Sequence, residues 1–189
     1  MFRTIKGLIG TGLLIGVSML ASADNTVQSR QIVLQGGNGE QLTIGQLLLS
    51  PTQDGYSAVV KMDDAPYGDQ FLSMRPFKCL ESEKQQLCHL PYPYQNKQHI
   101  QQDALIDLEY QLLFIRRAPN DYGINPWFGV YYKLEWQNPP EGPIVGTLYE
   151  TNLDVLAAPP EDPASKPITA DDLYEADHAE HWLPQLIIR

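Results

Sequence analysis

A short segment in the middle of the chain holds residue types that bind anions and rings. Arg116 and Arg117 open it, in a chain with 13 basic and 23 acidic residues. Guanidinium groups form paired hydrogen bonds to carboxylates and phosphates, and aromatic rings stack on ring-containing ligands. The segment lies between two stretches with strand-like alternation, so it is expected to be a loop, where binding residues often lie. We therefore predict a ligand-binding loop that consists of Arg116, Arg117, Asp121, Tyr122 and Trp127.

The same arginines also have a structural interpretation. Either guanidinium could form an internal ion pair with Asp121 or Glu135, while Trp127 anchors the loop in the core. Side chains alternate between the two faces of a strand, so only Arg116 has the parity of Phe114 and would continue its inward row. A carboxylate within about 4 Å of Arg116 would make that pair structural, whereas an unpaired guanidinium would mark an anion site.

A second candidate group lies near the C-terminus. On a helix, His178 and His181 would share one face with Asp177. Asp177, His178 and His181 could hold one metal ion, but zinc sites use three or four ligands and the strands offer no clear further one. The alternative is a solvated acidic helix face that also includes Glu175 and Glu180.

Motifs of the common catalytic sites do not occur in the sequence. It contains no Gly-x-Ser-x-Gly elbow, no His-Glu-x-x-His motif and no Gly-x-x-x-x-Gly-Lys phosphate loop. The Gly-rich stretch 36–39 leads into no helix, so a β-hairpin explains it better than a phosphate site. No cofactor is therefore expected, and the chain is interpreted as non-catalytic, with a metal-dependent enzyme as an alternative.

Short β-type runs cut by Gly, Pro, Asn and Asp dominate the chain. The stretch 104–115 alternates as a strand with one buried and one wet face, and 130–137 alternates in the same way. The buried face of 104–115 holds Ile106, Leu108, Tyr110, Leu112 and Phe114, and its wet face holds Asp107, Glu109 and Gln111. About eight strands without a long amphipathic helix between them predict a mainly β fold, a single antiparallel β-barrel or sandwich. The other expected runs are 31–35, 41–50, 56–62, 71–80, 85–90 and 144–156.

The two cysteines are predicted to form a disulfide bond. The runs 71–80 and 85–90 can pair as a hairpin, which places Cys79 opposite Cys88 at close to disulfide geometry. The bridge closes a short loop, so it should stabilise the fold by only about 2–3 kcal/mol. A redox pair is the alternative, but the spacing is not Cys-x-x-Cys.

Two further aromatic groups have alternative interpretations. The segments 74–77 and 89–94 could form a partner-binding surface, or they could be a strand edge protected against aggregation by proline. The inward rings of the two alternating strands could line the cavity of a small-molecule-binding barrel. Those rings are Tyr110, Phe114, Tyr132 and Trp136.

The C-terminal part is expected to pack on the same domain. Thr169 and Asp172 form a capping-box pattern, which predicts a helix over 170–183 that ends before Pro184. Pro and Ala dominate the segment before it, which is typical of an extended linker. The expected divisions are a β-rich domain at 24–158, a linker at 159–168, and a helix and apolar tail at 169–189.

The first 23 residues have the features of a secretory signal peptide. A basic start precedes the apolar run 7–20, and Ala21-Ser22-Ala23 matches a signal peptidase site, so cleavage is predicted before Asp24. The run is too short and too Gly-rich for a comfortable membrane span. An exported chain with two cysteines and no Asn-x-Ser/Thr sequon is expected to be periplasmic or secreted, and the pattern favours the bacterial periplasm.

The formal net charge of −10 argues against nucleic-acid binding, because the chain would be repelled by phosphate backbones. We therefore interpret the chain as an exported soluble protein that binds a partner protein or a small molecule in the cell envelope. No membrane span is expected after signal cleavage. A small-molecule-binding β-barrel and a metal-dependent enzyme are the alternatives.

Overall fold

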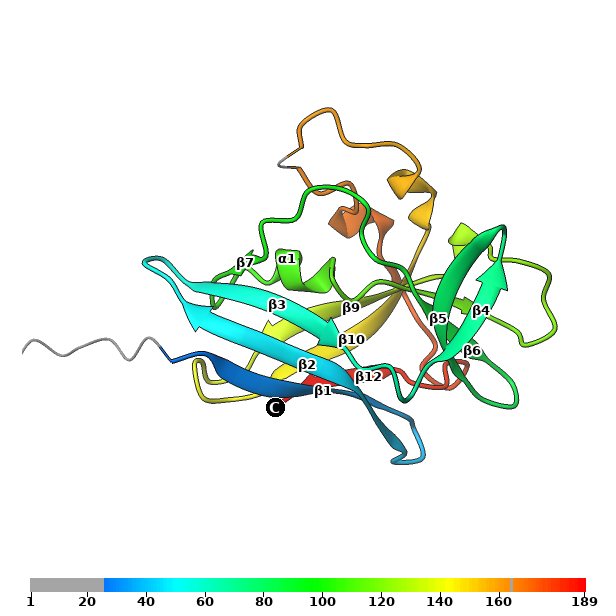
Figure 1. Ribbon diagram of the computed structural model, residues 1–189, viewed down its shortest axis with the longest axis horizontal. Helices are drawn as coiled ribbons and strands as arrows, with labels where there is room; N and C mark the ends of the chain where they lie inside the picture. The colour runs from blue at the N-terminus through cyan, green and yellow to red at the C-terminus, as the bar shows by residue number, and fades with distance from the viewer. Residues whose placement is uncertain (1–25, 164) are drawn as a thin grey trace, which may run out of the picture.

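The computed structural model describes residues 26–163 and 165–189, which form one antiparallel sheet of 12 strands (Figure 1). The predicted signal peptide lies outside these ranges. No helix within them is long and apolar enough to cross a membrane. The strands are β1 (Gln28–Gln35), β2 (Gln41–Pro51), β3 (Tyr56–Met62), β4 (Gly68–Leu72), β5 (Arg75–Glu81), β6 (Gln86–His89), β7 (His99–Ile100), β8 (Phe114–Arg117), β9 (Gly129–Trp136), β10 (Ile144–Thr151), β11 (Tyr174–Glu175) and β12 (Gln185–Ile188). The helical turns are α1 (Ile106–Glu109), η1 (Pro126–Phe128), η2 (Leu153–Leu156) and η3 (Ala170–Asp172).

The sheet is open. Its strand order is β4-β5-β6-β8-β9-β10-β12-β1-β2-β3-β7, with β11 beside β10, and the end strands β4 and β7 do not pair with each other. The predicted antiparallel β fold is confirmed. Of the two architectures that the sequence left open, a barrel or a sandwich, the barrel is wrong because the sheet does not close. The strand number exceeds the predicted eight partly because a turn at Ser73 and Met74 divides the expected run 71–80 into β4 and β5.

The sheet curls over itself and encloses the main core. In Figure 1, β1, β2 and β3 pass in front of β9 and β10. Phe114 and Tyr132 are fully buried between these layers, and their rings make an edge-on contact with centroids 6.1 Å apart. A smaller apolar cluster on the other face of β8 and β9 includes Tyr110, Ile115 and Tyr131.

The predicted strand over 104–115 is wrong in its first half, where the chain forms α1. Leu105, Leu108 and Leu112 are all buried, and their spacing is that of one helix face as well as part of an alternating row. The residues expected on a wet strand face, Asp107 and Glu109, are also buried. The helical turn places the Asp107 carboxylate beside Lys166 and the Glu109 carboxylate beside Lys133.

The cysteine hairpin has the predicted register. Cys79 lies opposite Cys88, Leu80 opposite Leu87 and Glu81 opposite Gln86. The two sulfur atoms are bonded, and both cysteines are fully buried. On its other side, β6 pairs with β8, the strand that carries both candidate arginines.

The predicted C-terminal helix over 170–183 is wrong. The capping box between Thr169 and Asp172 is present, but it starts only the 3-10 turn η3. Asp177 then accepts a hydrogen bond from the backbone N–H of Ala179, a local turn that competes with helix formation. The apolar tail becomes β12, which pairs with β10 on one side and β1 on the other.

Candidate functional site

The strand β8 positions the two candidate arginines on opposite faces of the sheet. Phe114 belongs to the main core and Ile115 to the smaller cluster, so Arg116 and Arg117 continue these two rows respectively. The side chain of Arg116 is 26% exposed, whereas Arg117 is only 6% exposed. Burial therefore separates two residues that look equivalent in the sequence.

Arg116 forms an ion pair with a residue that sequence reasoning did not identify. Its Nη2 lies 3.0 Å from Oε1 of Glu150 on β10, and its guanidinium carbon lies 5.5 Å from the centroid of the Phe128 ring. Neither Asp121 nor Glu135, the predicted partners, makes this pair. The sequence gives no sign of this ion pair, because Glu150 is distant from Arg116 along the chain and comes close to it only through strand pairing.

The predicted metal group is divided between two environments. The buried ring of His181 has its Nε2 3.0 Å from Oε1 of Glu150, while Asp177 and His178 are exposed. Burial and the nearby Arg116 lower the pKa of His181. Among the residues that the structure describes, no group of three or more His, Cys, Asp or Glu side chains is arranged to hold a metal ion.

Arg117 is a buried cation that has no acidic partner in the described part of the chain. It donates one hydrogen bond to Oε1 of Gln86 and another to the backbone oxygen of Asp121. Its Nε is buried and has no hydrogen-bond partner among the residues that the structure describes. Within the described ranges, no carboxylate oxygen lies within 4.0 Å of its nitrogen atoms.

The loop after β8 is held by short polar contacts. Asp121 accepts a hydrogen bond from the backbone N–H of Ala118, at 2.9 Å, so its carboxylate closes a turn. Ser73 in the β4–β5 turn accepts one from the backbone N–H of Ile124, at 3.3 Å. The loop and the β4–β5 hairpin are thus neighbours in space.

Two adjoining hollows lie against Arg117. One, of about 190 Å³, is lined by Lys84, Gln85, both arginines, Ala118, Asp121 and Phe128. The other, of about 290 Å³, is lined by Arg117, Asp121, Tyr122, Gly123, Ile124, Asn125 and Phe128. Arg117, Asp121 and Phe128 belong to both, so the buried guanidinium lies where the two hollows meet.

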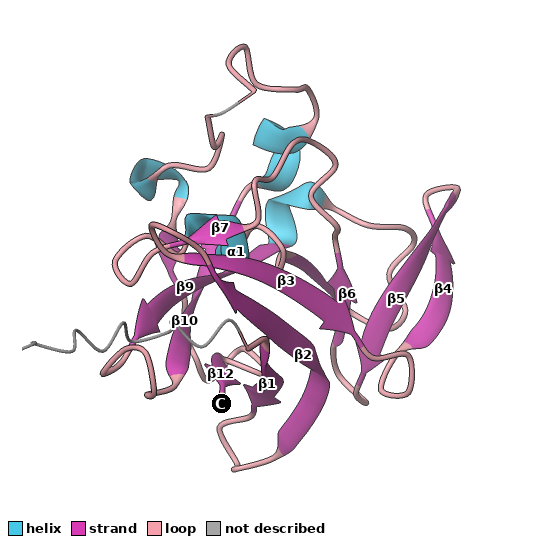
Figure 2. Cartoon of the chain, turned by 60° about the vertical axis from the view of Figure 1, so that its left-hand side comes forward, coloured by secondary structure: helices cyan, strands magenta, loops and turns pink. Residues whose placement is uncertain are grey.

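Large apolar side chains are exposed around this site. Tyr122 is fully exposed, and Trp127 is 66% exposed, so Trp127 does not anchor the loop in the core. Figure 2 shows β4 and β5 at one edge of the molecule, standing away from the curled part of the sheet. We name the exposed set on the loop and the β4–β5 hairpin the aromatic surface: Phe71, Met74, Tyr122, Trp127 and Phe128.

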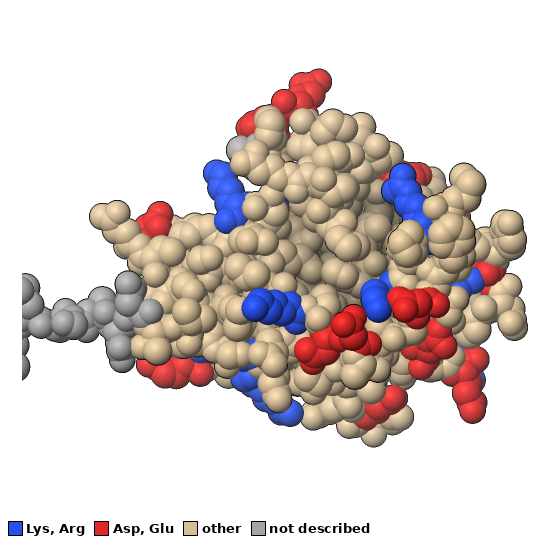
Figure 3. Space-filling model, viewed as in Figure 1, with Lys and Arg blue, Asp and Glu red and all other residues tan. Residues whose placement is uncertain are grey.

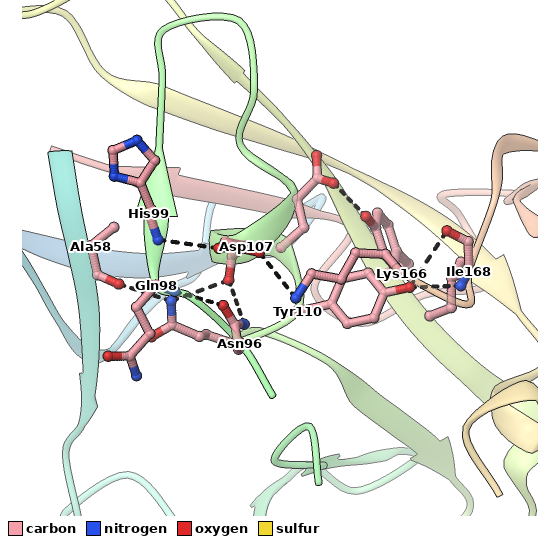
Figure 4. A network of polar contacts seen from close by, with 11 residues as sticks. Ala58, Asn96, Gln98, His99, Asp107, Tyr110, Lys166 and Ile168 are labelled. Carbon is pink, nitrogen blue, oxygen red and sulfur yellow. Dashed lines mark hydrogen bonds and ion pairs between the residues drawn. The ribbon is translucent and has the colours of Figure 1, made fainter. Parts of the chain in front are cut away.

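A second polar network surrounds α1 (Figure 4). Asp107 pairs with Lys166 at 3.0 Å, and both side chains are nearly buried. Lys166 also lies over the rings of Tyr92 and Tyr110, about 5 Å from their centroids. The backbone N–H of His99 donates to the Asp107 carboxylate. A hollow of about 310 Å³ beside this pair is lined by polar residues of the β7 region, including Lys97 and His99.

Glu109, the other buried carboxylate of α1, joins the helix to β9. It accepts hydrogen bonds from the Tyr131 hydroxyl and, at 2.9 Å, from the backbone N–H of Leu134. Lys133 lies 3.2 Å from the same carboxylate. Sequence reasoning missed this network because it placed Asp107 and Glu109 on the wet face of a strand.

The four rings proposed to line a cavity are instead packed against neighbours. Tyr56 and Trp136 are in ring contact, with centroids 5.3 Å apart, and Phe114 contacts Tyr132. The Tyr132 hydroxyl donates to the backbone oxygen of Leu183. Tyr110 lies in the smaller cluster and accepts a hydrogen bond from the backbone N–H of Ile168.

No family model, curated protein or solved structure matches the chain.

Proposed function

We propose that this chain is a non-catalytic interaction protein of the cell envelope that docks a partner protein on the aromatic surface. The observation that carries the proposal is the concentration of exposed apolar side chains. Of the nine large apolar residues exposed in the described ranges, five lie on two segments that contact each other through Ser73 and Ile124. Contiguous exposed apolar patches mark interaction sites, and Trp and Tyr often dominate the binding energy.

The backbone of the β4–β5 turn supports the proposal. Ser73 and Met74 both have positive φ, 47° and 62°, in the two-residue turn that closes the hairpin. A non-glycine residue in this region costs about 1–2 kcal/mol. Asn-Gly would fit such a turn without that cost. The hairpin instead presents a methionine side chain that is 87% exposed, and methionine adapts well to varied binding surfaces.

Charge favours a protein over a nucleic acid as the partner. The net charge is −10, and on the face in Figure 3 the basic side chains are scattered while several acidic side chains gather at the lower right. A nucleic-acid site would need a basic surface.

The proposed partner lies in the cell envelope because the chain is expected to be exported. The signal pattern predicts that protein recovered from its cell begins at Asp24. Mass spectrometry of intact protein that retained Met1 would contradict this localisation.

The docking proposal is tested by cross-linking the purified chain in an envelope extract. Tyr122→Ser combined with Trp127→Ser should abolish the cross-linked product, because both rings are exposed and their loss leaves the core intact. The matched control is Tyr174→Ser, which removes a ring that is 60% exposed on β11, outside the aromatic surface. A product that is unchanged in the double variant, or lost equally in the control, would contradict the proposal.

A further inference from the structure

The geometry points to a binding site for an organic carboxylate at Arg117. The assignment rests on the proposed function, because the same loop carries the aromatic surface, and it adds the chemistry of the group that is bound. The carboxylate would come from a free small molecule or from an acidic group of the docked partner. Free carboxylates test the site without any partner, so the two proposals can fail separately.

The first step is the charge of Arg117. A guanidinium stays protonated in proteins, and moving an unpaired charge out of water is strongly unfavourable. Only 6% of Arg117 is exposed. Its two hydrogen-bond acceptors, the side-chain oxygen of Gln86 and the carbonyl of Asp121, are both neutral. Two acceptors also leave part of a guanidinium's five N–H donors unused. An external anion would balance both the charge and the donors.

The second step is the contrast with Arg116. That guanidinium already contacts a carboxylate, Glu150, and lies beside a ring. Asp121, the nearest candidate to neutralise Arg117 in sequence, uses its carboxylate to accept the Ala118 N–H instead. In the described part of the chain, Arg116 therefore has a carboxylate partner and Arg117 has none.

The third step is the shape and lining of the two hollows. Arg117 lies where they meet, so an anion could enter from either one. Phe128 and Ile124 give the walls an apolar component that suits a carbon chain or ring attached to the anion. Volumes of about 190 and 290 Å³ are at or below the lower limit for drug-sized ligands. The site therefore fits a small organic acid or one acidic side chain.

The fourth step favours a carboxylate over a phosphate. The planar fork of a guanidinium matches the oxygens of a carboxylate and of a phosphate alike, so charge decides between them: one buried unpaired guanidinium balances the single negative charge of a carboxylate. A phosphate dianion would need a second cation. Two other cations line these hollows. Arg116 is already paired with Glu150, and Lys84 is exposed, so neither supplies a second buried, unpaired cation.

The experiment titrates the full chain with sodium acetate and sodium butyrate, against sodium chloride and sodium phosphate at equal ionic strength. Thermal unfolding should show a saturable rise in Tm with the carboxylates, larger for butyrate because of the apolar walls. Arg117→Met should abolish the rise. Arg117→Met removes an uncompensated charge but also leaves the Gln86 side-chain oxygen and the Asp121 carbonyl without their donor, so the readout is the carboxylate-induced shift in Tm and not the Tm without carboxylate. The matched control, Arg75→Gln, removes an exposed arginine outside both hollows and should retain the rise.

A carboxylate effect that persists in Arg117→Met, or no carboxylate effect in the unmodified chain, would overturn the assignment. An effect of phosphate equal to that of acetate would also overturn the choice of ligand class. Should Arg117→Met not fold, the assigned Nε–Hε resonance of Arg117 in the unmodified chain gives the answer directly. It should move along a saturable curve with acetate, and a resonance that does not move would overturn the site.

Discussion

The Nε2 atom of His181 lies 3.0 Å from Oε1 of Glu150, the same oxygen that Arg116 contacts from β8, across the intervening strand β9. One carboxylate therefore joins the segment after β11 to both β10 and β8. The pKa of His181 is lowered, chiefly by burial and next by the charge of Arg116, which together outweigh the attraction of Glu150. The imidazole is neutral and donates its Nε2–H to the carboxylate at neutral pH.

This relationship predicts a stability that falls on mild acidification. The folded chain resists protonation of His181, whereas the unfolded chain binds the proton near the ordinary histidine pKa of about 6.5. The free energy of unfolding should thus be constant above about pH 6.5 and decrease as the pH falls below that value. Urea unfolding across a pH series measures the slope. His181→Gln, which keeps an N–H donor for Glu150, should reduce it, and the exposed His178→Gln should not.

His89 should contribute to the same slope. Burial lowers its pKa, and its Nε2 lies 3.1 Å from the backbone oxygen of Gln111. The variant His181→Gln should therefore retain part of the pH dependence, and His89→Gln combined with it should remove more. A slope that is unaffected by both substitutions would contradict the assignment to these histidines.

Truncation of Phe114 should strongly destabilise the fold. Its ring is fully buried between the layers of the curled sheet and contacts Tyr132 and His89. Phe114→Ala should reduce the free energy of unfolding by about 3–5 kcal/mol. The matched control is Phe71→Ala, which truncates a ring that is 75% exposed and should change stability by less than about 0.5 kcal/mol. Denaturant unfolding of both variants makes the comparison, and equal losses would contradict the core assignment.

The Asp107–Lys166 pair should be costly to break from one side. Lys166→Met leaves a nearly buried carboxylate without its cation, which should cost about 3–5 kcal/mol. Adding Asp107→Asn removes the orphaned charge and should restore part of the loss, as a double-mutant cycle would show. Lys133→Met is the control, because Lys133 is half exposed and Glu109 retains Tyr131 and Leu134 as donors. A loss in Lys166→Met no larger than in this control would mean that the pair contributes little.

The disulfide bond should stabilise the hairpin without being required for the fold. Cys79 and Cys88 are nine residues apart, so the bridge closes a short loop. Replacing both by Ala, which places no hydroxyl in the apolar cluster, should cost at least about 2–3 kcal/mol in free energy of unfolding. The double variant should keep the β-sheet circular dichroism of the oxidised chain. A chain that failed to fold without the bridge would show that the disulfide organises more than its own hairpin.

Local patterns in the sequence were sufficient for elements whose partners are close along the chain. The β1–β2 hairpin forms around stretch 36–39, and Gly39 has the positive φ that this turn needs. The cysteine register follows from a short symmetric hairpin. Val130, Tyr132, Leu134 and Trp136 are all buried as their alternation predicted. In each case the turn chemistry and the two-residue period fix the local geometry.

Only the tertiary structure decided which of two valid local patterns formed. The stretch 104–115 carries both a strand period and the helical spacing of Leu105, Leu108 and Leu112, and buried partners for Asp107 and Glu109 stabilise the helical turn. The capping box at Thr169 favours a helix, but only the short 3-10 turn η3 forms. The C-terminal tail instead forms β12, which pairs with β10 and β1. The two arginines are adjacent in sequence, yet strand pairing brings Glu150 to Arg116 and leaves Arg117 buried without an anion. Long-range pairing determines where charges are compensated, and no short segment of sequence carries that information.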